Sequence, residues 1–132
     1  MSALSQADRA ERKALLAVRA ELERNPAEKV AILDVGAGPL TMLGYRYPGK
    51  SLTIVAVDPL ADEYDGLLRD AGIEPPVRTA SVAGEALLEH FGSGSFDIAY
   101  ASNALDHSAD PFTIISNMVA VARPGGVVLL RH

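Results

Sequence analysis

From residue 30 onward, short runs of aliphatic residues alternate with helix-like stretches. The runs show no polar alternation, which is typical of strands buried on both faces of a parallel sheet. We predict strands over Val30–Val35, Leu52–Val57, Pro76–Ser81, Phe96–Ala101 and Val127–Leu130. The third of these segments has the weakest pattern.

Apolar residues at helical spacing occupy the gaps between these runs and the region before them. They predict helices over Ser5–Arg24, Leu60–Ala71, Gly84–Phe91 and Pro111–Ala122. Asp110 is the expected N-cap of the last helix, with Pro111 at its first position. The predicted buried stripe of that helix consists of Ile114, Ile115, Met118 and Val119. Pro124-Gly125-Gly126 is expected to end the helix and to turn the chain into the last strand.

Alternating strands and helices define the fold class as α/β. We predict one domain, with a doubly wound, mainly parallel sheet of about five strands in the order 3-2-1-4-5 and helices on both faces. Residues 1–29 would form an N-terminal helix and residues 30–132 the α/β core. Ligands bind such sheets at the carboxyl ends of the strands, so functional residues are expected just after each strand.

Composition and charge narrow the range of partners. The 132 residues carry a formal net charge of −5, which disfavours a nucleic-acid partner. The absence of cysteine excludes disulfides, thiolate metal sites and cysteine nucleophiles. No apolar run approaches the roughly 20 residues of a membrane span, and the N-terminus lacks a secretory pattern. We therefore expect a cytoplasmic protein that binds neither nucleic acid nor membrane.

A glycine turn follows the first predicted strand, and an aspartate follows the second. Gly36-Ala37-Gly38-Pro39 allows a tight turn that a ligand can approach closely. Asp58 comes about 20 residues later, where a carboxylate can accept hydrogen bonds from both ribose hydroxyls. The alternatives are a turn without a ligand and a loop-capping aspartate, but the joint spacing favours a nucleoside site.

The turn departs from a dinucleotide fingerprint in two ways. Thr41 stands where the third glycine of that fingerprint is expected, and Asp34 lies just before the turn. A carboxylate there disfavours a diphosphate but can orient an ammonium or sulfonium group. Alternatively, Asp34 braces the turn by accepting backbone N–H bonds. The pattern therefore favours a cationic or neutral adenosine ligand.

Four segments in order resemble the class I S-adenosylmethionine-dependent methyltransferases. They are Ile32–Pro39, Val55–Pro59, Ser95–His107 and Ala122–Val127. The resemblance implies a Rossmann-like fold, S-adenosylmethionine as cofactor, and methyl transfer to an oxygen, nitrogen or carbon nucleophile. Members of the family continue beyond the fifth strand into a helix and a hairpin, and we expect neither of these within residues 30–132.

The resemblance also implies which residues bind the cofactor: Asp34, Gly36, Ala37, Gly38, Pro39, Asp58, Pro59, Leu60, Glu85, Asn103 and Ala104. The glycine turn would contact the methionine part and the ribose, Asp34 the amino group, and Asp58 the ribose diol. Pro59 and Leu60 would pack on adenine. Glu85, or failing that Ser81, would meet the adenine amine, while Asn103 and Ala104 would line the methionine end.

His107 is the candidate catalytic residue, because a neutral imidazole near the methyl group can deprotonate a hydroxyl nucleophile. The alternative, that His107 only stabilises the loop after the fourth predicted strand, is favoured. Asp106, His107 and Asp110 are the residues to consider for a metal site, but none is expected, since His90 and His132 have no obvious reason to join them. A sulfonium is already a good leaving group, so the reaction requires no dedicated catalytic residue.

Two other functions stay open. One is a catalytically inactive S-adenosylmethionine-binding domain or fragment. The other is an NAD(P)-dependent oxidoreductase, which Thr41 disfavours, as does the lack of any tyrosine followed four residues later by lysine. The acceptor is expected to be a small molecule. The last predicted strand would leave an apolar edge exposed unless further chain or a second copy, as in a homodimer, covers it.

Overall fold

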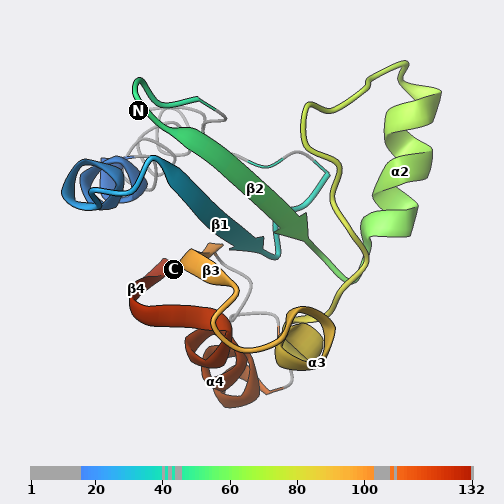
Figure 1. Ribbon diagram of the computed structural model, residues 1–132. Helices are drawn as coiled ribbons and strands as arrows, with labels where there is room; N and C mark the ends of the chain where they lie inside the picture. The colour runs from blue at the N-terminus through green and yellow to red at the C-terminus, as the bar shows by residue number, and fades with distance from the viewer. Residues whose placement is uncertain are drawn as a thin grey trace, which may run out of the picture.

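Four parallel strands form the sheet at the centre of the computed structural model, which describes residues 16–39, 41, 43, 46–102, 108 and 110–131 (Figure 1). The strands are β1 (Lys29–Val35), β2 (Ser51–Val57), β3 (Phe96–Ser102) and β4 (Ala122–Arg131). Their order is β2-β1-β3-β4, and every neighbouring pair is parallel. The predicted α/β class and parallel sheet are confirmed.

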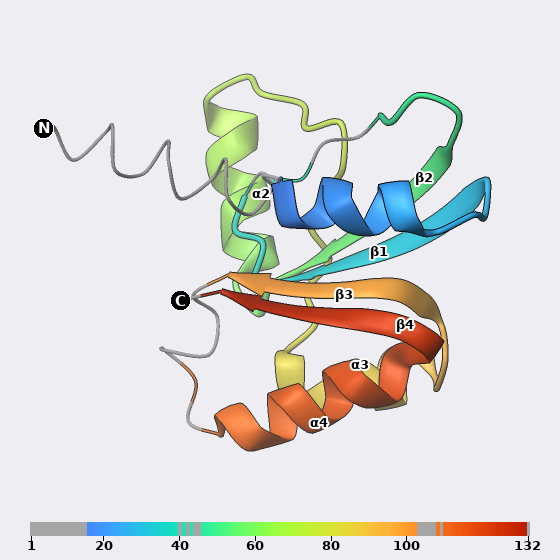
Figure 2. The same ribbon diagram turned by 90° about the vertical axis from the view of Figure 1, so that its left-hand side faces the viewer.

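Helices cover both faces of this sheet. They are the helix over residues 16–24, α2 (Ala61–Asp70), the 3-10 turn η1 (Gly84–Ala86), α3 (Leu87–Phe91) and α4 (Pro111–Val121). Figure 2 shows the helix over residues 16–24 on one face, and α3 and α4 on the other. Asp110 caps α4 as predicted, because its carboxylate accepts a hydrogen bond from the Thr113 N–H at 3.2 Å.

Alternate residues of the strands supply two apolar cores. On one face, Val30 and Ile32 of β1 pack with Val18 and Leu22 of the helix over residues 16–24. On the other face, Leu33 and Val35 of β1 pack in a core that also includes Leu87, Ile114, Met118 and Val121 from α3 and α4. Because both faces are covered, the central strands read as continuous aliphatic runs rather than as alternating ones.

The predicted third strand is wrong. Residues 76–81 make a single parallel bridge, Val57 to Ala80, beside β2. Pro76 has no N–H to give to a ladder, and Arg78 turns to the Asp65 carboxylate of α2 at 3.2 Å. The described residues therefore form a sheet of four strands in the order β2-β1-β3-β4, not five in the order 3-2-1-4-5.

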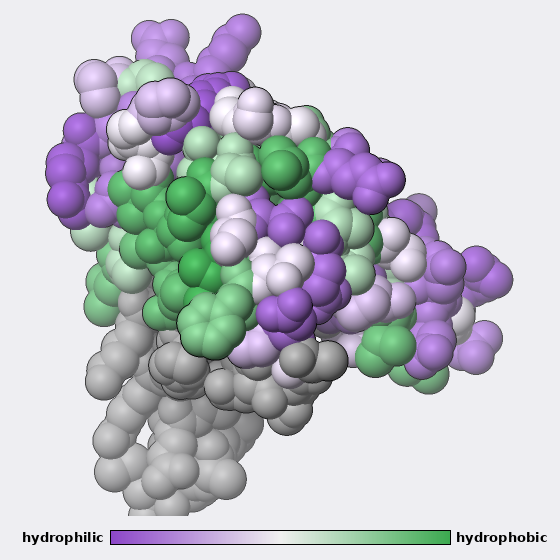
Figure 3. All heavy atoms as spheres, turned by 90° about the horizontal axis from the view of Figure 1, so that it is seen from below, coloured by the Kyte–Doolittle hydropathy of each residue, from purple (hydrophilic) through white to green (hydrophobic). Residues whose placement is uncertain are grey.

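The stripe predicted on α4 is partly wrong. Ile114 and Met118 are buried, but Ile115 is half-buried and Val119 is 59% exposed. The helix contacts the core through positions 114, 118 and 121, which leaves 119 on its outer side. Figure 3 views the molecule from the side of α3 and α4 and shows apolar side chains gathered on that face. Phe112 at the start of α4 is 81% exposed.

The last strand begins earlier than predicted, at Ala122, so Pro124-Gly125-Gly126 lies inside β4. Gly126 passes close to its neighbours there: a Cβ on it would lie 2.8 Å from the carbonyl oxygens of Asp97 and Arg123. β4 ends the strand order and has no strand beyond it among the described residues.

The predicted first helix, Ser5–Arg24, is helical where the structure describes it, from residue 16 to residue 24. Val18 and Leu22, which belong to the apolar residues at helical spacing that predict this helix, are buried. Within the described ranges, none of the helices combines the length and the apolar character that crossing a membrane requires.

Candidate nucleoside site at the carboxyl end of the sheet

The glycine turn is docked on the end of β2. Gly36 and Gly38 have φ angles of 70° and 71°, in the left-handed region that favours glycine. The N–H groups of Gly36 and Ala37 both donate to the Val57 carbonyl oxygen, at 2.8 and 3.0 Å. The Gly38 N–H donates to Asp58 Oδ2 at 3.1 Å. All three N–H groups of the turn are therefore taken by partners within the protein.

The Asp58 carboxylate faces this turn. Its Oδ2 accepts from the Gly38 N–H, and its Oδ1 accepts from the Leu60 N–H at 2.9 Å. The side chain is buried, with 8% of the residue exposed. A carboxylate oxygen can accept more than one hydrogen bond, so both oxygens keep capacity for a ligand. The structure thus brings together the turn and the carboxylate that the sequence singled out; their roles in ligand binding stay predictions.

Asp34, at the end of β1, is the second buried carboxylate. It accepts a 2.5 Å hydrogen bond from the Thr41 hydroxyl. Burial raises the pKa of Asp34 to about 6; the Thr41 bond opposes this rise and the nearby charge of Asp58 adds to it. Thr41, which stands where a dinucleotide fingerprint has glycine, therefore supports the carboxylate from its side chain. The alternative role for Asp34 was to accept hydrogen bonds from main-chain N–H groups of the turn. The bond observed comes instead from the Thr41 hydroxyl.

Thr79 is a further side chain at the turn, and the sequence analysis missed it. Its hydroxyl donates to the Gly38 carbonyl oxygen at 2.7 Å, and the residue is 4% exposed. No sequence signal identifies it, because the pattern of residues 76–81 predicts a strand. The bond joins two segments that are far apart in the sequence, and such a contact has no local pattern.

The remaining predicted residues differ in how they are placed. Pro59 and Leu60 are exposed beside Asp58, and Leu60 is 45% exposed. Glu85 is exposed, and its carboxylate accepts a hydrogen bond from the Ser108 hydroxyl at 3.1 Å. Ser81 and Pro39 are exposed. Asn103, Ala104, Asp106 and His107 lie outside the described residues.

No metal cluster is found in the part of the chain that the structure describes: no three acidic or histidine side chains there are grouped to hold an ion. Two of the three residues considered for a metal site, Asp106 and His107, fall outside that part.

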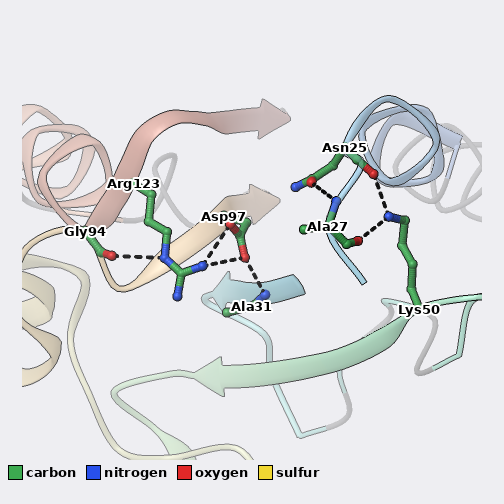
Figure 4. A network of polar contacts seen from close by, with 7 residues as sticks. All are labelled: Asn25, Ala27, Ala31, Lys50, Gly94, Asp97 and Arg123. Atoms are coloured by element: carbon green, nitrogen blue, oxygen red, sulfur yellow. Dashed lines mark hydrogen bonds and ion pairs between the residues drawn. The ribbon is translucent and has the colours of Figure 1, made fainter. Parts of the chain in front are cut away.

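A second polar network lies at the opposite, amino end of the sheet (Figure 4). Asp97 at the start of β3 accepts a hydrogen bond from the Ala31 N–H at 2.8 Å. Both carboxylate oxygens of Asp97 also accept from Arg123, at 3.1 and 3.2 Å. The Arg123 Nε donates to the Gly94 carbonyl at 3.3 Å. This network ties the beginnings of β1, β3 and β4 together.

Lys50 extends the same end of the molecule toward the helix over residues 16–24. Its ammonium group donates to the carbonyl oxygens of Asn25 and Ala27, both at 2.6 Å. A cavity of about 340 Å³ lies nearby, with Arg24, Asp97 and Arg123 among its lining residues. The side chains around it are paired with one another, which indicates a structural role for this end.

Comparison with known proteins identifies the family. Residues 33–130 match the family described as a methyltransferase domain. That match covers the end of β1, all of β2 and β3, nearly all of β4, the glycine turn and the strand-end carboxylates described above. The chain belongs to this family, within the class I S-adenosylmethionine-dependent methyltransferases.

Relatives include uncharacterized methyltransferases and one whose name places it in ubiquinone biosynthesis. An uncharacterized methyltransferase of Mycobacterium sp. (strain JLS) is 31% identical over 115 residues, which cover 86% of this chain and 42% of the relative. A ubiquinone biosynthesis O-methyltransferase of Caulobacter sp. (strain K31) is 28% identical over 116 residues, with 81% and 42% covered. The chain thus spans less than half the length of these curated relatives.

Solved structures agree with this assignment. The structure of a proposed type II methyltransferase from Anaeromyxobacter dehalogenans superposes with a TM-score of 0.59 at 27% identity. The superposition covers 86% of this chain and 44% of that protein. The α/β sheet described here is therefore a fold that solved methyltransferases share.

Proposed function

We propose that this chain binds S-adenosylmethionine against the glycine turn and Asp58, and that it serves methyl transfer to an oxygen, nitrogen or carbon atom of a small-molecule acceptor. The proposal is supported by one observation above all: the three N–H groups of the turn already have acceptors within the protein. A diphosphate needs free N–H donors in such a turn. An adenosyl ligand without phosphates does not.

The charge at the turn favours the same ligand. Asp34 and Asp58 are both buried there, and the ion pairs among the described residues involve neither of them. A ligand with an ammonium, a sulfonium and a ribose diol supplies the positive charge and the hydrogen-bond donors that two carboxylates lack. A dinucleotide would instead add negative charge to them.

Asp58 would bind the ribose. Its two oxygens are oriented by the N–H groups of Gly38 and Leu60, so the carboxylate is fixed before a ligand arrives. Each oxygen would accept from one ribose hydroxyl. The exposed Leu60 side chain beside it supplies apolar surface against which adenine would pack. Glu85 would accept from the adenine amine, in exchange for its bond to Ser108.

Asp34 would attract the amino group of the methionine part, directly or through water. Its hydroxyl bond from Thr41 leaves acceptor capacity on the carboxylate. A cation nearby would favour the ionised form and lower the pKa from its raised value of about 6. Binding of a cationic ligand would therefore release a proton at pH values near 6.

S-adenosylmethionine, when bound, supplies a methyl group on a sulfonium that is a good leaving group. The chain's own residues would then orient the cofactor, align the acceptor and exclude water. The proposal includes a small molecule as the methyl acceptor. It also includes His107 as the candidate general base, which would take a proton from a hydroxyl acceptor.

Calorimetry with S-adenosylmethionine, S-adenosylhomocysteine, NAD⁺ and NADP⁺ tests the ligand. We expect binding of the first two and none of the dinucleotides; the reverse result would contradict the proposal. A panel of hydroxyl, amine and carbon acceptors then tests the reaction. Binding without transfer to any of them would favour the second candidate, a catalytically inactive S-adenosylmethionine-binding domain.

A further inference from the structure

We infer that Thr79 is a positioning residue of the proposed cofactor site, where its hydroxyl fixes the Gly38 peptide against Asp58. The inference rests on the proposed function and adds to it a residue outside the glycine turn and the strand-end carboxylates. Thr79 lies in the segment that makes only one bridge to the sheet. Its role is argued from contacts rather than from strand pairing.

Gly38 is held from two sides by two different segments. Its N–H donates to Asp58 Oδ2 at 3.1 Å, and its carbonyl oxygen accepts from Thr79 Oγ1 at 2.7 Å. Both partners are buried, at 8% and 4% exposure. The same residue therefore connects the Thr79 hydroxyl to the carboxylate that would bind ribose.

Gly38 needs these hydrogen bonds because a glycine has no side chain to restrict its main-chain conformation. It has a φ of 71°, and a Cβ built on it would meet nothing within 4 Å. Glycine is thus required for the backbone angle and not for lack of space. A glycine has more conformations open to it than other residues, so external hydrogen bonds must select one.

Thr79 is itself fixed by the residue that follows it. The Ala80 N–H donates to the Ala56 carbonyl at 2.8 Å, and the Ala80 carbonyl accepts from the Asp58 N–H at 3.0 Å. The main chain of Asp58 is therefore bound to Ala80 while its side chain is bound to Gly38. Thr79, the residue before Ala80, donates its hydroxyl to the Gly38 carbonyl oxygen. Residues 79 and 80 thus contact both Gly38 and Asp58.

Two variants of nearly equal size test the hydroxyl. In Thr79→Val the donor is lost and the shape is kept, so the half-buried Gly38 carbonyl has no partner from this side chain. We expect its affinity for S-adenosylhomocysteine to fall about 5- to 20-fold. Thr79→Ser, which restores the donor, is expected to stay within about threefold of the original protein. Thr53→Val, the same change on an exposed residue of β2, is the control and should leave affinity unchanged.

Amide hydrogen exchange in the ligand-free 132-residue chain gives a second readout. We expect the Gly38 amide to exchange about tenfold faster in Thr79→Val than in Thr79→Ser, with the interior amides of β1 unchanged. Should Thr79→Val fail to fold, Thr79→Ala replaces it in both comparisons with Thr79→Ser.

The outcomes separate the two proposals. If the original chain binds no adenosyl ligand, the proposed function fails and with it the cofactor role of Thr79. If the original chain binds, but the hydroxyl-free variant binds equally well or its Gly38 amide exchanges at the same rate, only the inference on Thr79 is wrong. Equal losses in Thr79→Ser and Thr79→Val would also overturn it, because the hydroxyl would then not matter.

Discussion

Asp97 at the amino end of the sheet is paired with Arg123, and Lys50 there lies against two main-chain carbonyls. At the carboxyl end, the bonds to Asp34 and Asp58 come from neutral donors, the Thr41 hydroxyl and two main-chain N–H groups. The carboxylate at the amino end therefore has a cationic partner within the protein, whereas the two carboxylates at the carboxyl end have none among the described residues. The contrast indicates that the amino end serves stability and the carboxyl end serves a ligand.

The largest expected effect is on binding at the carboxyl end. Asp58→Ala removes the acceptor proposed for the ribose diol and the acceptor of the Gly38 N–H. We expect affinity for S-adenosylhomocysteine to fall by about 1–3 kcal/mol, the range of a charge-assisted hydrogen bond. Calorimetry measures it. Unchanged affinity would mean that Asp58 does not bind the ligand, and that the carboxyl end of the sheet does not differ from the amino end in this way.

Asp34→Asn tests whether uncompensated charge at that end costs stability. The folded pKa of Asp34, about 6, lies above its ordinary value of 3.8, so the folded state holds the proton more tightly. Stability from this group is therefore greatest below about pH 4 and falls as the pH rises through 6. Asparagine keeps an acceptor for Thr41 without the charge.

Urea denaturation of both proteins at pH 4.5 and pH 7.5 measures this difference. The original protein should lose on the order of 2 kcal/mol more than Asp34→Asn between these two pH values. Groups common to both proteins cancel in the comparison. Parallel pH profiles would mean that Asp34 is not a buried, uncompensated charge.

At the amino end, Asp97→Ala should act on stability and not on binding. It removes the acceptor of the Ala31 N–H and the partner of Arg123. We expect the free energy of unfolding to fall by about 1–2 kcal/mol and the affinity for S-adenosylhomocysteine to stay within about twofold. Asp97→Asn, which keeps an acceptor for Ala31, should lose less. A large loss of affinity would show that the two ends are coupled.

The smallest effect is expected for Arg24→Ala. Arg24 pairs with Glu21 at 2.6 Å, but its side chain is 72% exposed. An exposed pair of this kind contributes at most about 0.5 kcal/mol to the free energy of unfolding. A double-mutant cycle with Glu21→Ala measures it. A coupling well above that value would mean that the cavity beside Arg24 is less solvated than its exposure indicates.

Much of the fold could be predicted because burial on both faces leaves a plain signature. Val30–Val35 and Leu52–Val57 read as strands for that reason, and β1 and β2 match them to within a residue. Residues 76–81 also carry apolar side chains, yet they lie at an edge where prolines and a contact to α2 outweigh strand propensity. Val119 is not in the core because α4 also carries apolar residues, Phe112 and Val119, on an exposed side, so apolar spacing alone does not identify the buried face.

Some residues of the candidate site could likewise be predicted from the sequence, and others could not. Gly36, Gly38 and Asp58 could be found because a turn and a strand end have local signatures, and the structure brings these residues together. Thr79 could not, since its bond to Gly38 depends on tertiary placement of an irregular segment. In the sequence, Thr41 is only a departure from the dinucleotide fingerprint. In the structure, its hydroxyl donates a hydrogen bond to the Asp34 carboxylate.

The single bridge beside β2 also determines where this chain tolerates extra length. Of the main-chain hydrogen bonds among the described residues, none involves residues 74–78, while Ala80 is bonded on both sides. Gly72, Ile73 and Glu74 are exposed. A short flexible peptide inserted after Glu74 would thus lengthen an unpaired connection and leave the anchor at residues 79 and 80 in register. This loop is the place to attach a reporter group without disturbing the sheet.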